Sequence, residues 1–251
     1  MASIDTRNKA LISKGLPSAA ADGTESDMRL DQYKSVFMQN IVPKAHPLSV
    51  EGSYYTLTNP TPGTGIATIA AQATLADTAP FILFKNANAA GGKNIMLDYL
   101  KLICAAAGTG GTQIRYAVKV DGGGANRYTS GSGLATAPVT GLNTNIDSGT
   151  VSNAQFYAGA IVAAAANAAR LIAHGMFRSV IPVVADQYLL NFGGIDPAIG
   201  GLIPTGAAVT IQSFPAPPVV VGPGEWCAIH LWLPSQSVAS SFEFELGYWE
   251  R

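Results

Sequence analysis

The chain has 251 residues, of which 16 are acidic and 15 are basic, so charged side chains make up only 12 % of it. A soluble domain usually has about 25 % charged residues. The 48 % of hydrophobic residues excludes disorder along the whole chain, because disordered chains are poor in hydrophobic residues and rich in charge. A chain of this length forms one large domain or two small ones.

The formal net charge of −1 argues against nucleic acid as a partner, since non-specific nucleic-acid binding requires clustered Lys and Arg. The most basic stretch, residues 7–14, holds three cations and is expected to be a solvated tail. A glycine and Pro17 follow it in place of an apolar run, so we expect that this segment is not a signal peptide. We also expect the protein to be synthesised in the cytoplasm and to remain there. The most apolar segment, Ala158–Ala173, is broken by Asn167 and Arg170, so no membrane span is expected.

Residues 1–50 differ from the rest of the chain, because they are densely charged and lack sustained apolar alternation. We therefore predict an N-terminal arm at 1–50 and a body at 51–251. Within the arm, Ser26 is a candidate N-cap for a short helix over 26–41. Its apolar side chains share one stripe and are Leu30, Tyr33, Phe37 and Ile41. A stripe this narrow requires a docking surface, either on the chain's own body or on a neighbouring subunit.

After Pro47 the pattern changes to short apolar runs separated by clusters of Gly, Pro, Asn, Asp and Ser, which is typical of an all-β chain. The glycines at 122–124 are expected to close a hairpin after the run 113–120. Residues 163–169 are either part of a strand or a helical connector, because they are almost all alanine. The predicted strands are 54–57, 66–75, 81–85, 95–105, 113–120, 155–162, 170–178, 181–191, 207–214, 225–233 and 242–249.

Two of these runs indicate how the strands are layered. In 242–249, Phe and Leu alternate with Glu243 and Glu245, as in an antiparallel strand with one side facing water. In 225–233 both faces are apolar, so this strand is expected to lie between two layers or under a partner subunit. Numerous strands with irregular connections and no alternating helices predict two packed antiparallel sheets, that is, an all-β sandwich or jelly roll.

The two cysteines, Cys104 and Cys227, each lie in a strand-like apolar run without CxxC spacing. This pattern predicts buried, reduced thiols, although a single disulfide between them stays open. Burial would raise the pKa of a thiol and suppress its reactivity, so neither cysteine is expected to be a nucleophile.

The sequence offers few groups for catalysis or metal binding. It contains no GxSxG, P-loop, HExxH or GxGxxG pattern, and its histidines, His46, His174 and His230, form no HxH pair. We therefore expect no catalytic residue, no metal and no cofactor. Glu243 and Glu245 would be about 7 Å apart on one strand face, within the range of paired glycosidase carboxylates, but any alternating strand produces the same spacing.

The three tryptophans, Trp226, Trp232 and Trp249, are expected to pack in the core or against another subunit. Stacking on a carbohydrate is the alternative role for these rings. We predict that assembly contacts involve these tryptophans together with Leu30, Tyr33, Phe37 and Ile41 of the arm.

The segment 217–237, PPVVVGPGEWCAIHLWLPSQS, followed by the terminal run SFEFELGYWER, resembles the last two strands of jelly-roll virion proteins of tailed bacteriophages. The run KNIMLDYLKLICAAAGT at 93–109 and the richness in Ala, Gly and Thr are similar in style. The resemblance implies a capsid decoration (cement) protein or another head-associated structural protein, located in the virion. Its implied partners are copies of itself, in a trimer or larger ring, and other virion proteins such as the major capsid protein.

Three functions are consistent with these features of the sequence. The first is a non-enzymatic virion structural protein, since assembly interfaces suppress charge in their cores, as this chain does. The second is a glycan- or receptor-binding module of a phage fibre or spike that uses exposed aromatic rings. The third is a sugar hydrolase that relies on Glu243 and Glu245.

Overall fold

A computed structural model describes residues 45–59, 61–70, 73–110, 113–121, 140–158, 161, 169–178, 180–194, 211–234 and 236–251. The stripe of the predicted arm, Leu30 to Ile41, lies outside these residues, as do residues 122–124 and 162–168. The elements in chain order are α1 (Ala45–Val50), β1 (Tyr54–Thr58), β2 (Ile66–Ala67), β3 (Ile69–Ala70), β4 (Ile82–Asn86), β5 (Ile95–Ala106), β6 (Ile114–Asp121), β7 (Leu142–Asn143), β8 (Ala154–Ala158), β9 (Arg170–Arg178), β10 (Gln187–Phe192), β11 (Ile211–Ala216), β12 (Val220–Val221), β13 (Trp226–Leu233) and β14 (Ser241–Glu250).

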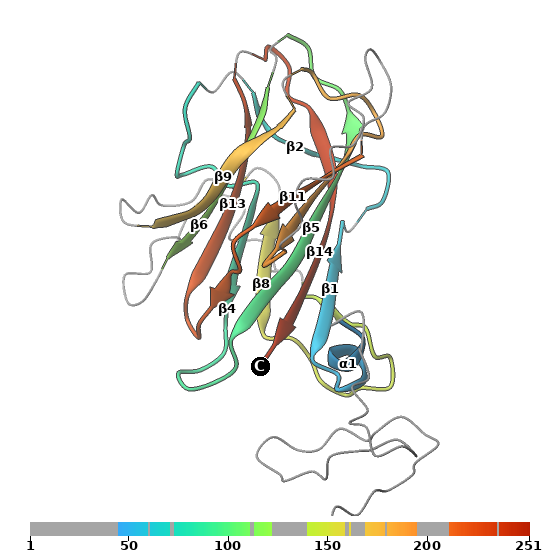
Figure 1. Ribbon diagram of the computed structural model, residues 1–251, viewed down its shortest axis with the longest axis vertical. Helices are drawn as coiled ribbons and strands as arrows, with labels where there is room; N and C mark the ends of the chain where they lie inside the picture. Colours follow the sequence, from blue (N-terminus) through green and yellow to red (C-terminus); the bar gives the residue numbers. More distant parts are fainter. Residues whose placement is uncertain are drawn as a thin grey trace, which may run out of the picture.

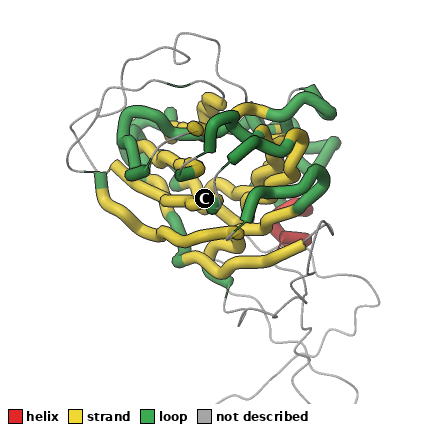
Figure 2. Tube along the Cα trace, turned by 90° about the horizontal axis from the view of Figure 1, so that it is seen from above, coloured by secondary structure: helices red, strands yellow, loops and turns green. Residues whose placement is uncertain are grey.

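The strands form two sheets that pack face to face as an all-β sandwich (Figure 1). One sheet, here the β14 sheet, has the order β11-β10-β5-β14-β1-β7, with β12 beside β5 and β2 beside β14. The other, the β13 sheet, has the order β8-β4-β13-β6-β9, with β3 beside β13. Seen from above, the strands lie in layers with the loops gathered around them (Figure 2).

The topology is that of a jelly roll. The eight longer strands in chain order are β1, β4, β5, β6, β9, β10, β13 and β14, if β8 and β11 are set aside as additions at the sheet edges. Numbered one to eight, these strands run 1-8-3-6 in the β14 sheet and 2-7-4-5 in the β13 sheet. Two four-stranded sheets in this order are the double Greek key of a jelly roll. The predicted fold class is therefore confirmed.

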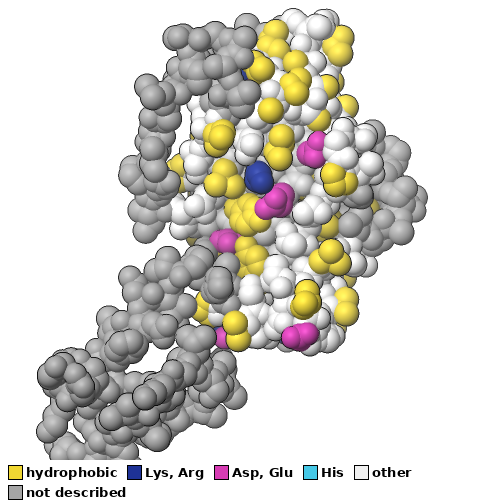
Figure 3. Space-filling view, turned by 90° about the vertical axis from the view of Figure 1, so that its right-hand side faces the viewer, with side chains coloured by type: hydrophobic (Ala, Val, Ile, Leu, Met, Phe, Trp, Pro, Cys, Tyr) yellow, Lys and Arg dark blue, Asp and Glu magenta, His cyan; other side chains and the backbone are white. Residues whose placement is uncertain are grey.

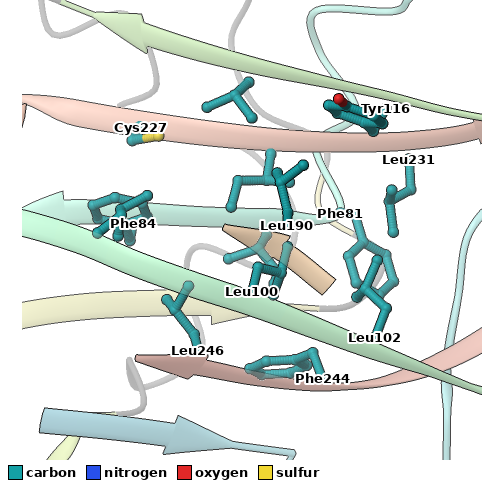
Figure 4. Packing of buried hydrophobic residues seen from close by; sticks show 14 of the residues in the cluster. Phe81, Phe84, Leu100, Leu102, Tyr116, Leu190, Cys227, Leu231, Phe244 and Leu246 are labelled. Atoms are coloured by element: carbon teal, nitrogen blue, oxygen red, sulfur yellow. The ribbon is translucent and has the colours of Figure 1, made fainter. Parts of the chain in front are cut away.

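The core lies between the sheets and is built by the alternation of side chains along the strands. On β14 the residues Phe242, Phe244, Leu246 and Tyr248 point inward and are at most 5 % exposed, while Glu243 and Glu245 lie on the outer face. Phe244 and Leu246 share this layer with Leu100 and Leu102 of β5, and residues of the β13 sheet such as Phe84 and Cys227 face them (Figure 4). Burial of such side chains is the main source of stability in a sandwich of this kind.

Aromatic rings close the core along both long sides of the sandwich. On the β1 side, Phe156 lies 5.2 Å from both Phe84 and Tyr248 between ring centroids. On the β9 side, Phe177 stacks on Tyr116 at 4.4 Å and also contacts Tyr188. Each group joins strands of the two sheets, so it holds the sheets together where the sandwich would otherwise open.

The connection from β6 to β9 contains residues 122–169 and supplies an extra strand to each sheet. β7 pairs with β1 in the β14 sheet, and β8 pairs with β4 in the β13 sheet. Ser152, between these two strands, donates a hydrogen bond to the buried Glu250 carboxylate at 2.5 Å. β6 pairs with β13 and β9, so the hairpin predicted directly after 113–120 is wrong. A glycine run permits a tight turn, but β6 pairs with β9, which follows only after residues 122–169.

Most predicted strands are present, and several differ in extent; the predicted strand 155–162, for example, is β8, which ends at Ala158. The predicted strand 66–75 is wrong as one unit, because Thr68 interrupts it and donates both its backbone N–H and its hydroxyl to the Ser240 carbonyl. The short strands β2 and β3 on either side of Thr68 consequently join different sheets. The predicted strand 181–191 begins only at Gln187, because Pro182 lacks an amide donor and Ala185 adopts a φ of 73° in the preceding turn.

Strand β13 is buried at all eight positions, as its two apolar faces predicted. The chain itself supplies the second layer. On the outer face, Trp226 packs with Tyr157, Ile161 and Ala169, while His230 lies against residues 76–79. A partner subunit is thus not required to cover this strand.

Both cysteines are free and buried, as predicted. Desolvation by burial, followed by the negative charge of Asp186, raises the pKa of the Cys104 thiol to about 12, and burial alone raises that of Cys227.

We expect neither cysteine to react with Ellman's reagent at pH 8 in the native protein. Both thiols should react at once in 6 M guanidinium chloride, because unfolding removes the burial that raises their pKa and so allows the nucleophilic thiolate to form. Titration of the native and denatured protein measures this difference, and reaction of one thiol equivalent in the native state would contradict the burial of Cys104 or Cys227.

Candidate assembly surfaces

The three tryptophans occupy the outer faces of the two sheets. Trp226 and Trp232 lie on β13 and are 6 % and 7 % exposed, while Trp249 lies half-buried on the outer face of β14. Lys85 covers Trp226, with its Nζ 5.4 Å from the ring centroid. Sugar stacking requires an open ring face. Of the three rings, that of Trp249 is the most accessible. A role of these residues in assembly stays a prediction.

A different set of apolar side chains is exposed on the β9 side of the sandwich. β9 is an edge strand, and within the described ranges no strand pairs with its outer edge. Four residues of β9 are exposed, and two of them are apolar, Leu171 at 50 % and Met176 at 43 %. The loop between β9 and β10 and the start of β11 add more exposed apolar side chains. We call this set the open-edge surface, and it comprises Leu171, Met176, Val180, Val184 and Ile211.

Beside the open-edge surface the β13 sheet is hollowed on its outer side. The hollow has a volume of about 300 Å³ and is lined by residues of β6, β9 and β13 with Gln113. Arg115 donates from Nε to the Gln113 side-chain oxygen at 2.9 Å and is exposed. His174 and Met176 come from β9, and the Trp232 ring forms part of the wall. The hollow thus combines one cation with apolar and amide groups.

The outer face of the β14 sheet carries a network of phenol and carboxylate groups. Glu245 accepts hydrogen bonds from Tyr99 Oη at 2.5 Å and from Lys101 Nζ at 3.3 Å. Tyr54 Oη donates to Asp98 Oδ2 at 2.9 Å. Burial and then the hydrogen bond to Glu245 raise the pKa of Tyr99 well above its ordinary value, so the phenol stays a donor.

The predicted carboxylate pair is therefore part of a hydrogen-bonded surface. Glu245 is engaged by Tyr99 and Lys101, and Glu243 accepts the backbone N–H of Gly63 at 3.0 Å. Gly247, between Tyr54 and Tyr99, leaves room for both side chains, because a Cβ there would lie 2.4 Å from the Tyr54 hydroxyl oxygen and 2.4 Å from the Tyr99 ring. These contacts give Glu243 and Glu245 a structural role on the surface of the sheet. The same side of the molecule shows few charged side chains among white and yellow ones (Figure 3).

Two of the three histidines occupy one row of the β13 sheet. His230, Ala117 and His174 are register partners on β13, β6 and β9. His174 is exposed, whereas His230 is 1 % exposed and its ring nitrogens make no hydrogen bond of good geometry. Among the described residues, no three His, Cys, Asp or Glu side chains gather as a metal site would require.

The environment of His230 lowers its pKa to about 4. Desolvation by burial is the main cause, and the nearby Asp77 carboxylate, which Lys119 Nζ contacts at 2.5 Å, acts in the opposite direction. His230 is therefore neutral in the folded protein at any pH above about 5, whereas in the unfolded chain it gains a proton below about pH 6.5.

We expect the free energy of unfolding to fall by about 2 kcal/mol between pH 7.5 and pH 5 because of His230. The sign follows from the lowered pKa: in this range the unfolded state binds a proton that the folded state does not. Urea unfolding at the two pH values measures the loss. The His230→Asn variant should lose that part of the pH dependence, and the His174→Asn variant should retain it. Equal slopes for His230→Asn and the unchanged protein would contradict this prediction.

Sequence reasoning missed the open-edge surface. Leu171 and Met176 lie in a run that reads as an ordinary half-buried strand, and only the position of β9 at the sheet edge exposes them. The signal available in the sequence was the exposed Arg170 at the start of this run, since charge is common on edge strands.

Comparisons with protein-family models, with curated proteins and with solved structures found no match. In the described part of the chain, no helix is both long and apolar enough to cross a membrane.

Proposed function

We propose that this chain is a non-enzymatic structural protein of a virion, a decoration or head-associated subunit that stabilises a particle through symmetric contacts between copies. The observation that carries the proposal is the open-edge surface. It places exposed Leu171 and Met176 on an edge strand of nine residues, where backbone donors and acceptors face outward. Exposed apolar side chains beside an unpaired edge are typical of protein–protein contact sites.

The composition and the resemblance support the same function. With only 12 % charged residues, the chain can bury surface in an assembly without desolvating many charges. The jelly roll occurs in many viral capsid proteins, but a fold alone does not define a function. The similarity of 217–237 and of the C-terminal run to phage virion proteins adds the virion to the proposal.

The test is the oligomeric state of the purified chain by native mass spectrometry and negative-stain microscopy. We expect a discrete symmetric oligomer that dissociates at least tenfold more readily in the Met176→Asp variant. The control is Val238→Asp, because Val238 is 54 % exposed and lies outside the open-edge surface. A monomer at all concentrations would overturn self-assembly.

The virion location is tested separately by stoichiometric co-purification of the chain with phage particles. Absence of the chain from the particles would overturn the proposed virion location.

The hollow on the β13 sheet favours glycan binding as a second candidate function. Arg115 could pair with an acidic sugar, and the amide of Gln113 offers donor and acceptor groups. A glycan array with the unchanged protein and Arg115→Met tests this function. Binding that Arg115→Met abolishes would support it, and no binding would leave the structural function alone.

A further inference from the structure

Among the residues that the structure describes, the four most exposed large hydrophobic side chains gather at one end of the sandwich. Val50 ends α1 and is 72 % exposed, and the loop around β7 contributes Leu142 at 71 %, Ile146 at 94 % and Val151 at 75 %. We call this group the apolar lobe. It lies at the β1–β7 side of the sandwich, where the yellow-green segment wraps around α1 (Figure 1).

Hydrogen bonds hold the two stretches of the apolar lobe together. Asn145 Nδ2 donates to the Val50 carbonyl at 3.3 Å, and the hydroxyls of Ser49 and Thr144 lie 2.8 Å apart. The Gly52 carbonyl accepts from Asn143 Nδ2 at 2.9 Å and from Thr150 Oγ1 at 2.7 Å. The lobe is thus a built surface in which polar groups fix the backbone and apolar side chains point outward.

The tight packing at Gly52 shows how closely the loop follows α1. Gly52 has a φ of 72°, and a Cβ at this position would lie 2.3 Å from the Ser148 hydroxyl. A residue other than glycine would therefore push the loop away from the end of α1. An arrangement this specific for a surface loop, with apolar side chains outward, indicates an interaction surface.

The N-terminal part of the chain joins the described fold at α1, whose last residue, Val50, belongs to the apolar lobe. Residues 1–44 precede α1, and their apolar stripe of Leu30, Tyr33, Phe37 and Ile41 ends four positions before Ala45. Four residues span at most about 14 Å, so Ile41 cannot be farther than that from the start of α1. If the predicted helix forms, residues 30–41 cover about 17 Å along its axis.

We propose that residues 30–41 dock on the apolar lobe of their own copy. The stripe needs an apolar surface because an isolated helix of this length is only marginally stable in water. A connection of three residues, 42–44, gives the segment a millimolar effective concentration at its own lobe, which favours this copy over a neighbouring one. The inference uses a different surface from the open-edge surface, so it holds or fails independently of the proposed function.

The first test is hydrogen–deuterium exchange of the full chain at a dilute, micromolar concentration. We expect amides in 30–41 to be protected, and Ile146→Asp to reduce this protection at least tenfold. The matched control is Val238→Asp, because Val238 is 54 % exposed and belongs to neither the apolar lobe nor the open-edge surface. Phe37→Asp, within the segment, should reproduce the effect of Ile146→Asp. Unprotected 30–41 in the unchanged protein, or equal loss with Val238→Asp, would overturn the proposal.

The second test identifies the copy on which the segment docks. The native cysteines are buried, so cysteines introduced as Lys34→Cys and Asp147→Cys can be oxidised selectively. We expect a disulfide within one chain, seen as a monomer on a non-reducing gel with the mass of two lost hydrogens. A covalent dimer would show that the segment of a second copy occupies the lobe and would overturn docking within one copy. No disulfide at all would overturn the contact.

Discussion

Replacing Arg178 with methionine should lower the free energy of unfolding by about 3–5 kcal/mol, because it leaves the Asp186 carboxylate buried without its cation. Asp186 is 0 % exposed, and its Oδ2 forms an ion pair with Arg178 Nη1. The same oxygen accepts the Val183 backbone N–H at 2.7 Å and Tyr188 Oη at 3.1 Å. These neutral donors orient the carboxylate but do not balance its charge.

Urea unfolding at pH 7 measures this loss, with Arg115→Met as the control. Arg115 is exposed and bonds only to Gln113 among the described contacts, so its replacement should change the free energy by no more than about 0.5 kcal/mol. The double variant Arg178→Met with Asp186→Asn should recover part of the stability, because it removes both charges. A loss in Arg178→Met that equals the loss in the control would contradict the prediction.

The ion pair also connects the two ends of the loop that carries Val180 and Val184 of the open-edge surface. Arg178 ends β9, and Asp186 directly precedes β10. The Cys104 backbone N–H donates to the Asp186 carbonyl at 2.8 Å and thereby ties this loop to β5. Arg178→Met should therefore weaken association between copies as well as stability, if the open-edge surface is an interface.

The sequence predicted the long strands because each buries one face. The alternation in 242–249 and the doubly apolar run 225–233 both reflect the sandwich directly. Such strands make up the eight-strand framework, so the fold class followed from pattern alone. Alternation shows which side chains of a strand face inward, but not which strands lie beside it. The order of the strands within the two sheets therefore could not be worked out from the sequence pattern.

The pattern failed where contacts distant in sequence decide the structure. β7 has two residues, and its pairing with β1 depends on Asn143 and Thr150 bonding to Gly52. The apparent strand 66–75 is divided because Thr68 finds its acceptor at Ser240, 172 positions away. No window of neighbouring residues contains this information.

The candidate site was only partly predictable for the same reason. Glu243 and Glu245 were correctly placed on one wet face, but their partners Gly63, Tyr99 and Lys101 come from elsewhere in the chain. For Trp226 and Trp232 the sequence left packing in the core and packing against a subunit open, and the chain itself buries most of their surface. Exposed apolar side chains such as Ile146 reveal an interface only after the fold is known, because in the sequence they resemble core residues.

Replacing Phe156 with alanine should lower the free energy of unfolding by about 3–5 kcal/mol, as for other large aromatic side chains removed from a core. Phe156 is 1 % exposed on β8, and its ring lies 5.2 Å from those of Phe84 and Tyr248. It thus joins the inserted connection 122–169 to both sheets. Urea unfolding monitored by circular dichroism measures the loss.

Val238→Ala is the control for this change, because Val238 is 54 % exposed and belongs to neither the apolar lobe nor the open-edge surface. Its replacement should change the free energy of unfolding by no more than about 0.5 kcal/mol. A loss near that value for Phe156→Ala would mean that β8 is an appendage the sandwich does not need. A large loss would instead make the insertion part of the cooperative core, since the ring of Phe156 contacts Phe84 on β4 and Tyr248 on β14.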